Sequence, residues 1–372
     1  MKPKLLMTAS TFAHIRSFHL PYLKAFKELG WETHVACGGA PREIPFADKT
    51  YAITLEKSML APGNLRASKE LRKIIQREGF SLVICHTSLA ACFTRLALLG
   101  LRKMPKAINV VHGYLFDDST NVLKAAVLKC AEHLLSGVTD CVLTMNGYDY
   151  RWAAANRAGR SVRHIPGMGV DTKRLTGDTA REAFGFTDED YVLVYPAEFS
   201  ARKNQKLLIQ ALSHMPEQVK LLLPGEGALK AQCVSLAESL GVAARVVFPG
   251  QLENIAAALR SADAAVSCSR SEGLPFNVME AMLCGLPVIA SRVKGHVDLI
   301  DDSVNGLLFS TEEELIQCVN RLISEPAFAR ELSMRAKETA AAYTLPEVLP
   351  QVMEEYLEVC GHAEERMNED AR

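Results

Sequence analysis

Residues 264–290 read AAVSCSRSEGLPFNVMEAMLCGLPVIA, and this stretch contains a strand, a helix and a second strand. The runs AAVS at 264–267 and PVIA at 287–290 are short and apolar, as buried strands are. Between them, Pro275 suits the first turn of a helix, and Gly285 ends that helix about ten residues later. Two strands joined by a helix predict one βαβ unit of a parallel sheet.

The same alternation of short apolar runs and longer amphipathic stretches continues along the chain. Further strands are expected at residues 4–7, 32–36, 82–85, 106–111, 141–144, 191–195, 220–223 and 245–248. Helices are expected at residues 20–29, 64–78, 89–100, 121–135, 205–213, 227–240, 254–261, 276–284, 312–324, 327–342 and 345–359. This order predicts an α/β fold made of two doubly wound, Rossmann-like parallel-sheet units in tandem.

A chain of 372 residues exceeds the size at which one hydrophobic core usually stops growing, so two domains are expected. We place them at residues 1–165 and 166–344, because Pro166 and two nearby glycines interrupt the chain just after a strand signal. A last helix covers residues 345–360. The polar tail of residues 361–372 is expected to be disordered.

The net charge of −1 conceals an asymmetry between the two halves. Residues 1–165 carry 23 Lys and Arg against 12 Asp and Glu, whereas the remaining residues carry 19 against 31. A basic half indicates an anionic partner, such as a phosphate-bearing acceptor or a membrane surface, and incidental surface charge is the alternative. Nucleic acid is not expected as a partner, because no run of basic residues is interleaved with aromatic ones.

The ten cysteines follow no regular spacing and include no Cys-x-x-Cys pair, so we expect reduced core residues of a cytosolic protein. The start, MKPKLLMTAS, is too short in its apolar part for a signal peptide, and no apolar run is long enough for a membrane span. The protein is therefore expected in the cytoplasm, with peripheral contact to the inner face of the cell membrane. Basic helical stretches at 96–106 and 122–135 suit that contact, and ordinary packing on the sheet is the alternative.

Two carboxylates frame the start of the helix in the segment quoted first. Glu272 precedes this helix, and Glu280 lies on it a little over one turn past Phe276. The backbone amides of Phe276, Asn277 and Val278 are expected to point out of the helix start and to bind an anion. A nucleotide-sugar fits this arrangement, with sugar hydroxyls at Glu272, the diphosphate on the amides and ribose hydroxyls near Glu280. The alternative is a solvated loop glutamate next to a helix-surface glutamate.

Three further groups follow expected strand ends, which is where parallel sheets bind ligands. Arg202 and Lys203 stand side by side in a loop and can neutralise a diphosphate. Gly225 and Gly227 allow the backbone to approach a ligand closely. His112 ends a strand and can hold a hydroxyl or a sugar oxygen. A solvated basic loop, an ordinary turn and a structural histidine are the respective alternatives.

Together these elements resemble the retaining, nucleotide-sugar-dependent glycosyltransferases of family 4, which have the GT-B architecture of two facing Rossmann-like domains with a cleft between them. The most specific part of the resemblance is ADAAVSCSRSEGLPFNVMEAMLCGLPVIA at residues 262–290, followed by NGLL at 305–308. The opening TASTFAHIRSFHLPYL, at residues 8–23, looks like the branch that builds capsular and exopolysaccharide repeat units in bacteria.

The resemblance implies a role for each candidate residue. Three of them would be catalytic: Glu272 would contact the transferred sugar, Lys203 the phosphates, and His112 would lie beside the reacting centre. Glu280 would bind ribose. Arg202, the two glycines and the three helix amides would complete the donor site in the second domain. The first domain would bind the acceptor, and the last helix would cross back onto it.

Two positions depart from the family pattern. Relatives commonly carry an arginine five residues before the phosphate-binding lysine, but this chain has Glu198 there, so Arg202 is the nearest spare cation. Many relatives also have a Gly-Gly turn after the first strand, which STFAH replaces here. We place the acceptor-binding residues at His14, His19 and His86.

The resemblance implies transfer of a hexose from a UDP-sugar to a hydroxyl of a lipid-diphosphate-linked or other glycan acceptor, with retention at the anomeric carbon. No metal or other cofactor is expected, because Lys203 and the helix amides would stabilise the leaving diphosphate and no Asp-x-Asp pair stands at a strand end. Two alternatives stay open: a UDP-sugar epimerase of the same architecture, and a non-catalytic scaffold that binds sugar nucleotides.

Overall fold

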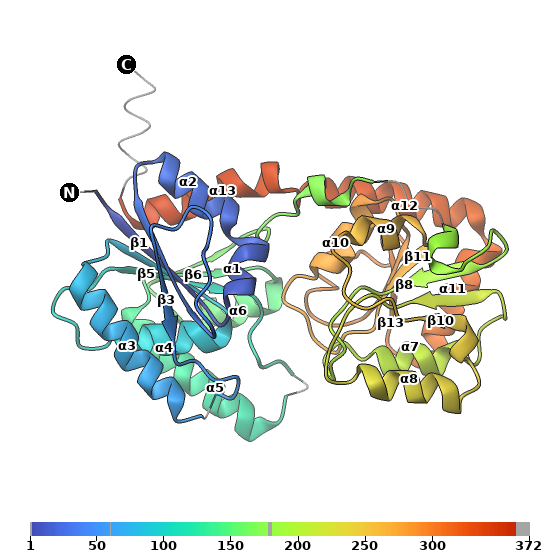
Figure 1. Cartoon of the computed structure of the whole chain (residues 1–372), viewed down its shortest axis with the longest axis horizontal. Coiled ribbons are helices and arrows are strands. Elements are labelled where there is room, and N and C mark those ends of the chain that lie inside the picture. Colours follow the sequence, from blue (N-terminus) through green and yellow to red (C-terminus); the bar gives the residue numbers. More distant parts are fainter. Residues whose placement is uncertain (1, 60, 119, 178–180, 362–372) are drawn as a thin grey trace, which may run out of the picture. The chain divides into compact units, whose positions relative to one another are not determined.

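The chain folds into two α/β units, shown in Figure 1 as a computed structural model. The structure describes residues 2–59, 61–118, 120–177 and 181–361. One unit contains the residues up to Gly169 and the segment that begins at Val348, and the other unit spans Val170–Glu347. The predicted α/β fold with two parallel, Rossmann-like sheets is confirmed.

The first sheet has seven parallel strands in the order β3-β2-β1-β4-β5-β6-β7. They are β1 (Lys4–Ala9), β2 (Glu32–Gly38), β3 (Lys49–Ile53), β4 (Leu82–His86), β5 (Lys106–Val111), β6 (Cys141–Thr144) and β7 (Ser161–His164). The central strands are buried almost throughout, because helices lie on both faces of the sheet. This double coverage explains why these strands read as continuous apolar runs.

The described residues of this unit form six α-helices between its strands. They are α1 (Phe12–Phe18), α2 (Leu20–Glu28), α3 (Gly63–Glu78), α4 (Ser88–Leu98), α5 (Val122–Leu135) and α6 (Gly147–Ala155). Local sequence sets their ends: α3 stops at Gly79, which adopts φ 66°, and α5 starts behind Asn121, whose side chain accepts hydrogen bonds from the amides of Leu123 and Lys124.

The last helix, α13 (Leu345–Val359), attaches the C-terminal segment to the first unit. The ring of Tyr356 is fully buried, with centroids 6.0 Å from Tyr22 and 6.1 Å from Phe26. Tyr22 also donates a hydrogen bond of 3.0 Å to the carbonyl of Met168. The first unit includes Met168 and ends at Gly169, a few residues past the boundary expected at residue 165.

The second sheet has six parallel strands in the order β10-β9-β8-β11-β12-β13. They are β8 (Tyr191–Val194), β9 (Val219–Leu222), β10 (Val246–Val247), β11 (Ala264–Ser267), β12 (Val288–Ser291) and β13 (Leu307–Phe309). The helices are α7 (Gln205–Leu212), α8 (Lys230–Ser239), α9 (Ile255–Arg260), α10 (Phe276–Leu283), α11 (Glu312–Ser324) and α12 (Pro326–Ala341).

The elements absent from the sequence prediction are short or lie at a sheet edge. The strands β3, β7 and β13 are edge strands, and the first two keep partly exposed polar residues that break the apolar pattern. The helices α1 and α6 have seven and nine residues, too few to show a helical period clearly.

Three further expectations concern disulfides, the tail and the membrane. All ten cysteines lie in the described part of the chain and are free, and Cys85, Cys141 and Cys268 are buried as predicted. The disordered tail predicted for residues 361–372 falls outside the described residues beyond Gly361. Within the described ranges, none of the helices combines the length and the apolarity needed to cross a bilayer.

Candidate active site

The second sheet has one point where its strand order reverses. From β8 the chain first adds β9 on one side and later adds β11 on the other side, so β8 and β11 are neighbours. Open parallel sheets bind ligands beyond the carboxyl ends of the strands at such a point. Arg202 and Lys203 lie in the loop after β8, and Glu272 lies in the loop after β11. The structure therefore brings these three predicted residues to one place.

Glu272 holds both cations of the neighbouring loop. Lys203 Nζ donates to Glu272 Oε1 at 2.6 Å, and Arg202 Nη1 donates to Glu272 Oε2 at 2.8 Å. Glu272 is only 7% exposed, whereas half of the Arg202 side chain remains accessible. Two cations on one buried carboxylate leave an excess of positive charge, which suits a second anion.

The pKa values of this cluster reflect burial and pairing together. Burial alone would raise the pKa of Glu272, but Lys203 and Arg202 outweigh it and lower the pKa to about 2. Burial also lowers the pKa of Lys203, although Glu272 opposes this change. The lowered pKa of Glu272 and the lowered pKa of Lys203 are physically consistent. Glu272 faces two cations, whereas Lys203 faces one anion and the like charge of Arg202.

Hydrogen bonds fix the two loops to each other. The hydroxyl of Tyr195 donates to the carbonyl of Lys203 at 2.8 Å and lies 2.9 Å from the hydroxyl of Ser269. The backbone amide of Arg270 donates to the carbonyl of Arg202 at 2.8 Å. Since Tyr195 is fully buried, the cations are positioned by a rigid support. Sequence reasoning did not identify Tyr195 or Ser269.

The loop after β12 closes the site from a third side. Gly295 adopts φ 82°, and a Cβ there would lie 2.7 Å from the carbonyl oxygen of Gly273. The buried ring of His296 lies 3.0 Å from the Ser267 hydroxyl, and burial lowers its pKa to about 4. A neutral imidazole thus supports the base of the Glu272 loop. Sequence reasoning missed both residues, although the strand-end rule applied to β12 would have found them.

The start of α10 differs in one respect from the prediction. The amide of Val278 donates to the carbonyl of Pro275 at 3.1 Å, so it is used inside the first turn and is not available to a ligand as expected. Pro275 causes this, because as the N-cap its carbonyl faces the first helical amides. Among the residues that the structure describes, no side chain caps the start of α10, which carries the positive end of the helix dipole. Phe276 and Asn277 lie partly buried at this end.

Glu280 lies one turn into α10, and its environment is opposite to that of Glu272. Burial raises the pKa of Glu280 to about 7, and Arg174 opposes this only in part. A carboxyl group that titrates near neutral pH can accept or donate a hydrogen bond to a hydroxyl. The structure thus gives the two predicted carboxyl groups different protonation behaviour.

The two glycines of the turn after β9 contact the chain itself. A Cβ on Gly225 would lie 2.1 Å from the carbonyl oxygen of Ala197, and a Cβ on Gly227 would lie 2.4 Å from that of Phe199. The segment extends the β8–β9 pairing, because Phe199 N–H donates to the carbonyl of Glu226 at 2.9 Å. The protein's own backbone therefore accounts for both glycines, and a role in ligand binding stays a prediction.

Glu198, the departure from the family pattern, is exposed to solvent. Its backbone carbonyl accepts a hydrogen bond of 2.9 Å from Gln205, and its charge is the weakest of the influences acting on the pKa of Lys203. The Glu198 side chain is therefore not part of the buried ion-pair cluster.

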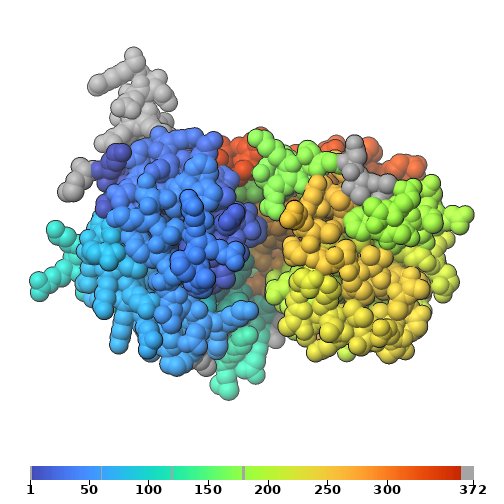
Figure 2. Space-filling model, viewed as in Figure 1, coloured from blue at the N-terminus to red at the C-terminus, as the bar shows by residue number. Residues whose placement is uncertain are grey.

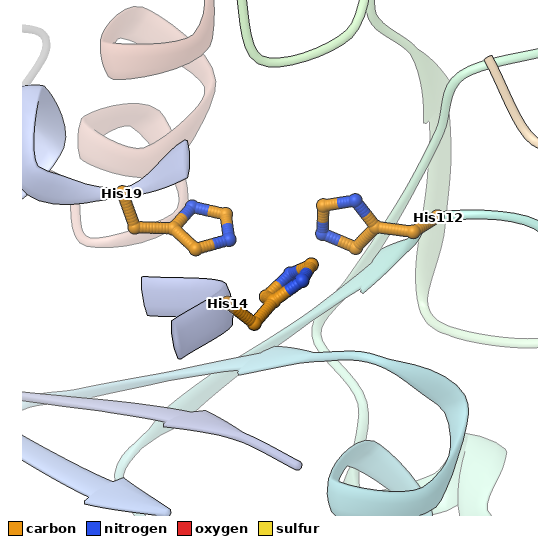
Figure 3. Close-up of side chains that lie close together, drawn as sticks. All are labelled: His14, His19 and His112. Atoms are coloured by element: carbon orange, nitrogen blue, oxygen red, sulfur yellow. The ribbon is translucent and has the colours of Figure 1, made fainter. Parts of the chain in front are cut away.

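In the first unit, four predicted histidines converge. His14 lies on α1, His19 joins α1 to α2, His86 ends β4 and His112 directly follows β5. The ring centroids of His19 and His86 are 3.7 Å apart, and those of His14 and His112 are 4.9 Å apart. Figure 3 shows three of these side chains, His14, His19 and His112, close together. Because β1 and β4 are neighbours, this cluster marks the point where the strand order of the first sheet reverses.

The chain matches two protein families, one in each half. Residues 22–174 match the family described as Glycosyltransferase Family 4, and residues 177–341 match Glycosyl transferases group 1. The putative glycosyltransferase EpsD of Bacillus subtilis is 33% identical over 369 residues, which cover 96% of this chain and 97% of EpsD.

Solved structures with the same fold are more distant in sequence. Sucrose-phosphate synthase from Thermosynechococcus elongatus superposes with a TM-score of 0.80 at 19% identity, covering 96% of this chain and 99% of the synthase. HepE from Anabaena, solved in complex with UDP and glucose, gives a TM-score of 0.76 at 19% identity, covering 95% of this chain and 98% of HepE.

Proposed function

This chain belongs to the glycosyltransferases that join a family 4 domain to a group 1 domain in the GT-B fold, and we propose that its donor is a UDP-hexose. The proposed acceptor is a hydroxyl of a lipid-diphosphate-linked glycan in bacterial cell-surface polysaccharide synthesis. In this proposal the anomeric configuration of the sugar is retained. The complex of HepE with UDP and glucose supports the choice of donor.

The observation that carries the proposal is the cluster in which Lys203 and Arg202 share Glu272. Phosphate oxygens form charge-assisted hydrogen bonds with the same donor groups that now hold the carboxylate. An arriving diphosphate would take over Lys203 and Arg202, and Glu272 would then be released to accept hydrogen bonds from hydroxyls of the sugar. One exchange of partners thus places both ends of the donor.

The proposed reaction breaks the bond between the anomeric carbon and the diphosphate oxygen. The electron pair stays on the diphosphate, where Lys203, Arg202 and the uncapped start of α10 stabilise the developing charge. The acceptor oxygen bonds to the anomeric carbon on the face that the diphosphate leaves, and its proton passes to an oxygen of the departing phosphate. We propose that no metal ion assists this step, since these cations already serve the leaving group.

Glu280 and His112 have supporting roles in this proposal. Glu280 would bind the ribose hydroxyls, and its raised pKa allows it to remain protonated or ionised near neutral pH as the hydroxyls require. His112 would bind the acceptor side in the first unit, together with His14, His19 and His86.

We also propose that the first unit rests on the inner face of the cell membrane through α5. Four large apolar side chains of this helix are mostly exposed: Val122 (80%), Leu123 (78%), Val127 (61%) and Leu134 (68%). The helix lies at the lower edge of the first unit in Figure 1, and its side chains reach the surface in Figure 2. Exposed apolar groups beside lysines are typical of helices that bind an anionic lipid surface.

A transfer assay tests the proposed function. Purified protein is supplied with UDP-hexoses or GDP-hexoses and a polyprenyl-diphosphate-linked sugar, and nucleotide release and product anomer are followed by NMR. We expect release of UDP only when the acceptor is present, and a product of the same anomeric configuration as the donor. Epimerisation without acceptor, or UDP binding without any turnover, would instead support one of the two alternative functions.

A pair of lysine variants links that activity to the site. Lys203→Ala should lower kcat at least about 100-fold, the usual effect of removing one preorganised group at a leaving charge. Lys206→Ala is the matched control, because this lysine is exposed and lies three residues further along the chain, in α7. Equal activity of Lys203→Ala and wild type would remove Lys203 from the mechanism.

A further inference from the structure

We propose that His14, His19 and His112 bind one divalent transition-metal ion of the zinc class in the first unit. One ring nitrogen from each residue lies within 4.8 Å of the corresponding nitrogens of the other two. Figure 3 shows the three rings turned toward a common centre from α1, from the junction of α1 and α2, and from the end of β5. The proposal concerns the first unit alone and goes beyond the donor chemistry proposed above.

The hydrogen bonding of these rings points to a ligand. His19 is completely buried, yet within the described part of the chain neither of its ring nitrogens has a hydrogen-bond partner. The Nε2 atom of His14 is likewise buried and lacks a partner among the described residues. Buried polar atoms in folded proteins are nearly always paired, so these nitrogens indicate a group that completes them.

The charge state of the cluster suits a cation. Burial lowers the pKa of His14 to about 4 and lowers the pKa values of His19 and His112 well below the usual value, and for His19 and His112 neighbouring histidines act in the same direction. The imidazoles are therefore neutral at neutral pH. A neutral imidazole offers the lone pair that a metal ion requires, without first releasing a proton.

The ligand set selects the class of metal. Three imidazoles without a carboxylate or thiolate favour zinc, cobalt, nickel or copper over magnesium and calcium. Zinc with three histidines keeps a fourth position for water or another oxygen ligand. With bonds of about 2.0 Å, tetrahedral nitrogens stand about 3.3 Å apart, so the rings would close inward by about 1.5 Å at most.

His86 positions two of the ligands. Its ring stacks on that of His19 at 3.7 Å, and its Nδ1 lies 3.2 Å from His112 Nε2. Because the His86 ring contacts both His19 and His112, it limits the rotation of those two rings and keeps them near the common centre. We assign His86 this positioning role because it lies outside the group of three whose nitrogens are mutually close.

A second group in the same unit, made of Glu32, His34 and Glu78, also has its possible ligand atoms close enough together to bind a metal ion. This group already has cationic partners: Lys4 lies 3.5 Å from Glu32, and Lys49 lies 3.0 Å from Glu78. A metal ion there would have to displace these lysines. The histidine cluster contains no such competing cation, so it is the better site.

Metal content is the direct test. Full-length protein without an affinity tag is stripped with a chelator, dialysed against micromolar zinc at neutral pH and analysed by mass spectrometry for bound metal. We expect about one zinc ion per chain in wild type and an affinity more than about 100-fold lower in His14→Ala, since even groups that only support ligands change affinity by about 10–100-fold. His133→Ala should bind as wild type does, because His133 is exposed and lies outside the cluster.

A second measurement does not depend on any variant folding. X-ray absorption of zinc-loaded wild type should show imidazole scattering, with a nitrogen shell at about 2.0 Å. Absence of stoichiometric zinc in wild type, full zinc retention by His14→Ala, or an absorption spectrum without imidazole would each overturn the proposal. None of these readouts involves sugar transfer, so they are separate from the test of the proposed function.

Discussion

Replacing Glu272 by glutamine should change UDP binding and sugar transfer in opposite directions. In wild type, the diphosphate has to compete with the Glu272 carboxylate for Lys203 and Arg202. Glutamine keeps the size of the side chain but removes its charge, so both cations become available to phosphate. The same substitution removes the carboxylate that the proposal assigns to the sugar hydroxyls.

The structure gives the magnitude. The pKa of Glu272 falls from its usual 4.5 to about 2, which corresponds to about 3 kcal/mol of net stabilisation of the carboxylate by its surroundings. If UDP replaces about half of that interaction, Glu272→Gln should tighten UDP binding by about 1.5 kcal/mol, or about tenfold in Kd. Loss of the sugar contact should lower kcat at least about 100-fold.

Isothermal titration with UDP and the transfer assay measure the two effects on the same preparations. Glu198→Gln is the matched control, because this carboxylate is exposed and influences Lys203 least. It should change the Kd for UDP by less than about twofold, as screened surface charges do. Thermal unfolding verifies that Glu272→Gln is folded. If UDP binds more weakly to Glu272→Gln, the exchange of partners at Lys203 and Arg202 is wrong.

Three further outcomes follow from the structure. Because the pKa of Glu272 is lowered in the folded state, the carboxylate contributes fully to stability above its unfolded pKa of about 4.5, and this contribution is lost as the pH falls toward about 2. In urea unfolding over this pH range, the free energy of unfolding of wild type should therefore fall by about 3 kcal/mol more than that of Glu272→Gln. Gly227→Ala should destabilise the second unit by about 2–4 kcal/mol in chemical denaturation. Gly241→Ala should lower stability by only about 1 kcal/mol, because a Cβ there would have no neighbouring atom within 4 Å. Equal effects of the two substitutions would contradict the close backbone approach at Gly227. Leu123→Ser should reduce sedimentation with anionic vesicles about tenfold, while Met334→Ser, at another mostly exposed apolar residue in the second unit, should have no effect. Unchanged sedimentation of Leu123→Ser would exclude α5 as the contact.

The fold followed from the sequence at the central strands of both sheets, which are buried on both faces. The runs at β5, β6 and β11 are mostly apolar and almost entirely buried, and their predicted bounds agree with the structure. The edge strands β3 and β7 were missed because polar, partly exposed side chains interrupt their apolar pattern, and β13 was missed because it has only three residues. The α/β class depends on the central strands and was therefore predictable without them.

The candidate site was predictable in its residue types but not in its pairings. The strand-end rule located Lys203 and Glu272 from the sequence, since each follows an apolar run. It could not reveal that they pair, because the adjacency of β8 and β11 depends on strand order, which local patterns do not encode. For the same reason the sequence prediction gave His112 and His14 different roles, whereas the strand order of the first sheet brings their ring centroids to 4.9 Å.

The pairing also explains how the second unit holds the largely buried Lys203 and the half-exposed Arg202 before a donor binds. A buried lysine without a partner is strongly disfavoured, and breaking a buried pair by removing one partner destabilises a protein by about 3–5 kcal/mol. Glu272 supplies that partner from within the chain, so Lys203 and Arg202 are held in the geometry that a diphosphate needs. Donor binding then exchanges one anion for another at cations that are already in place. A free sugar carries no charge with which to displace a carboxylate, so affinity at this site must come mainly from the diphosphate.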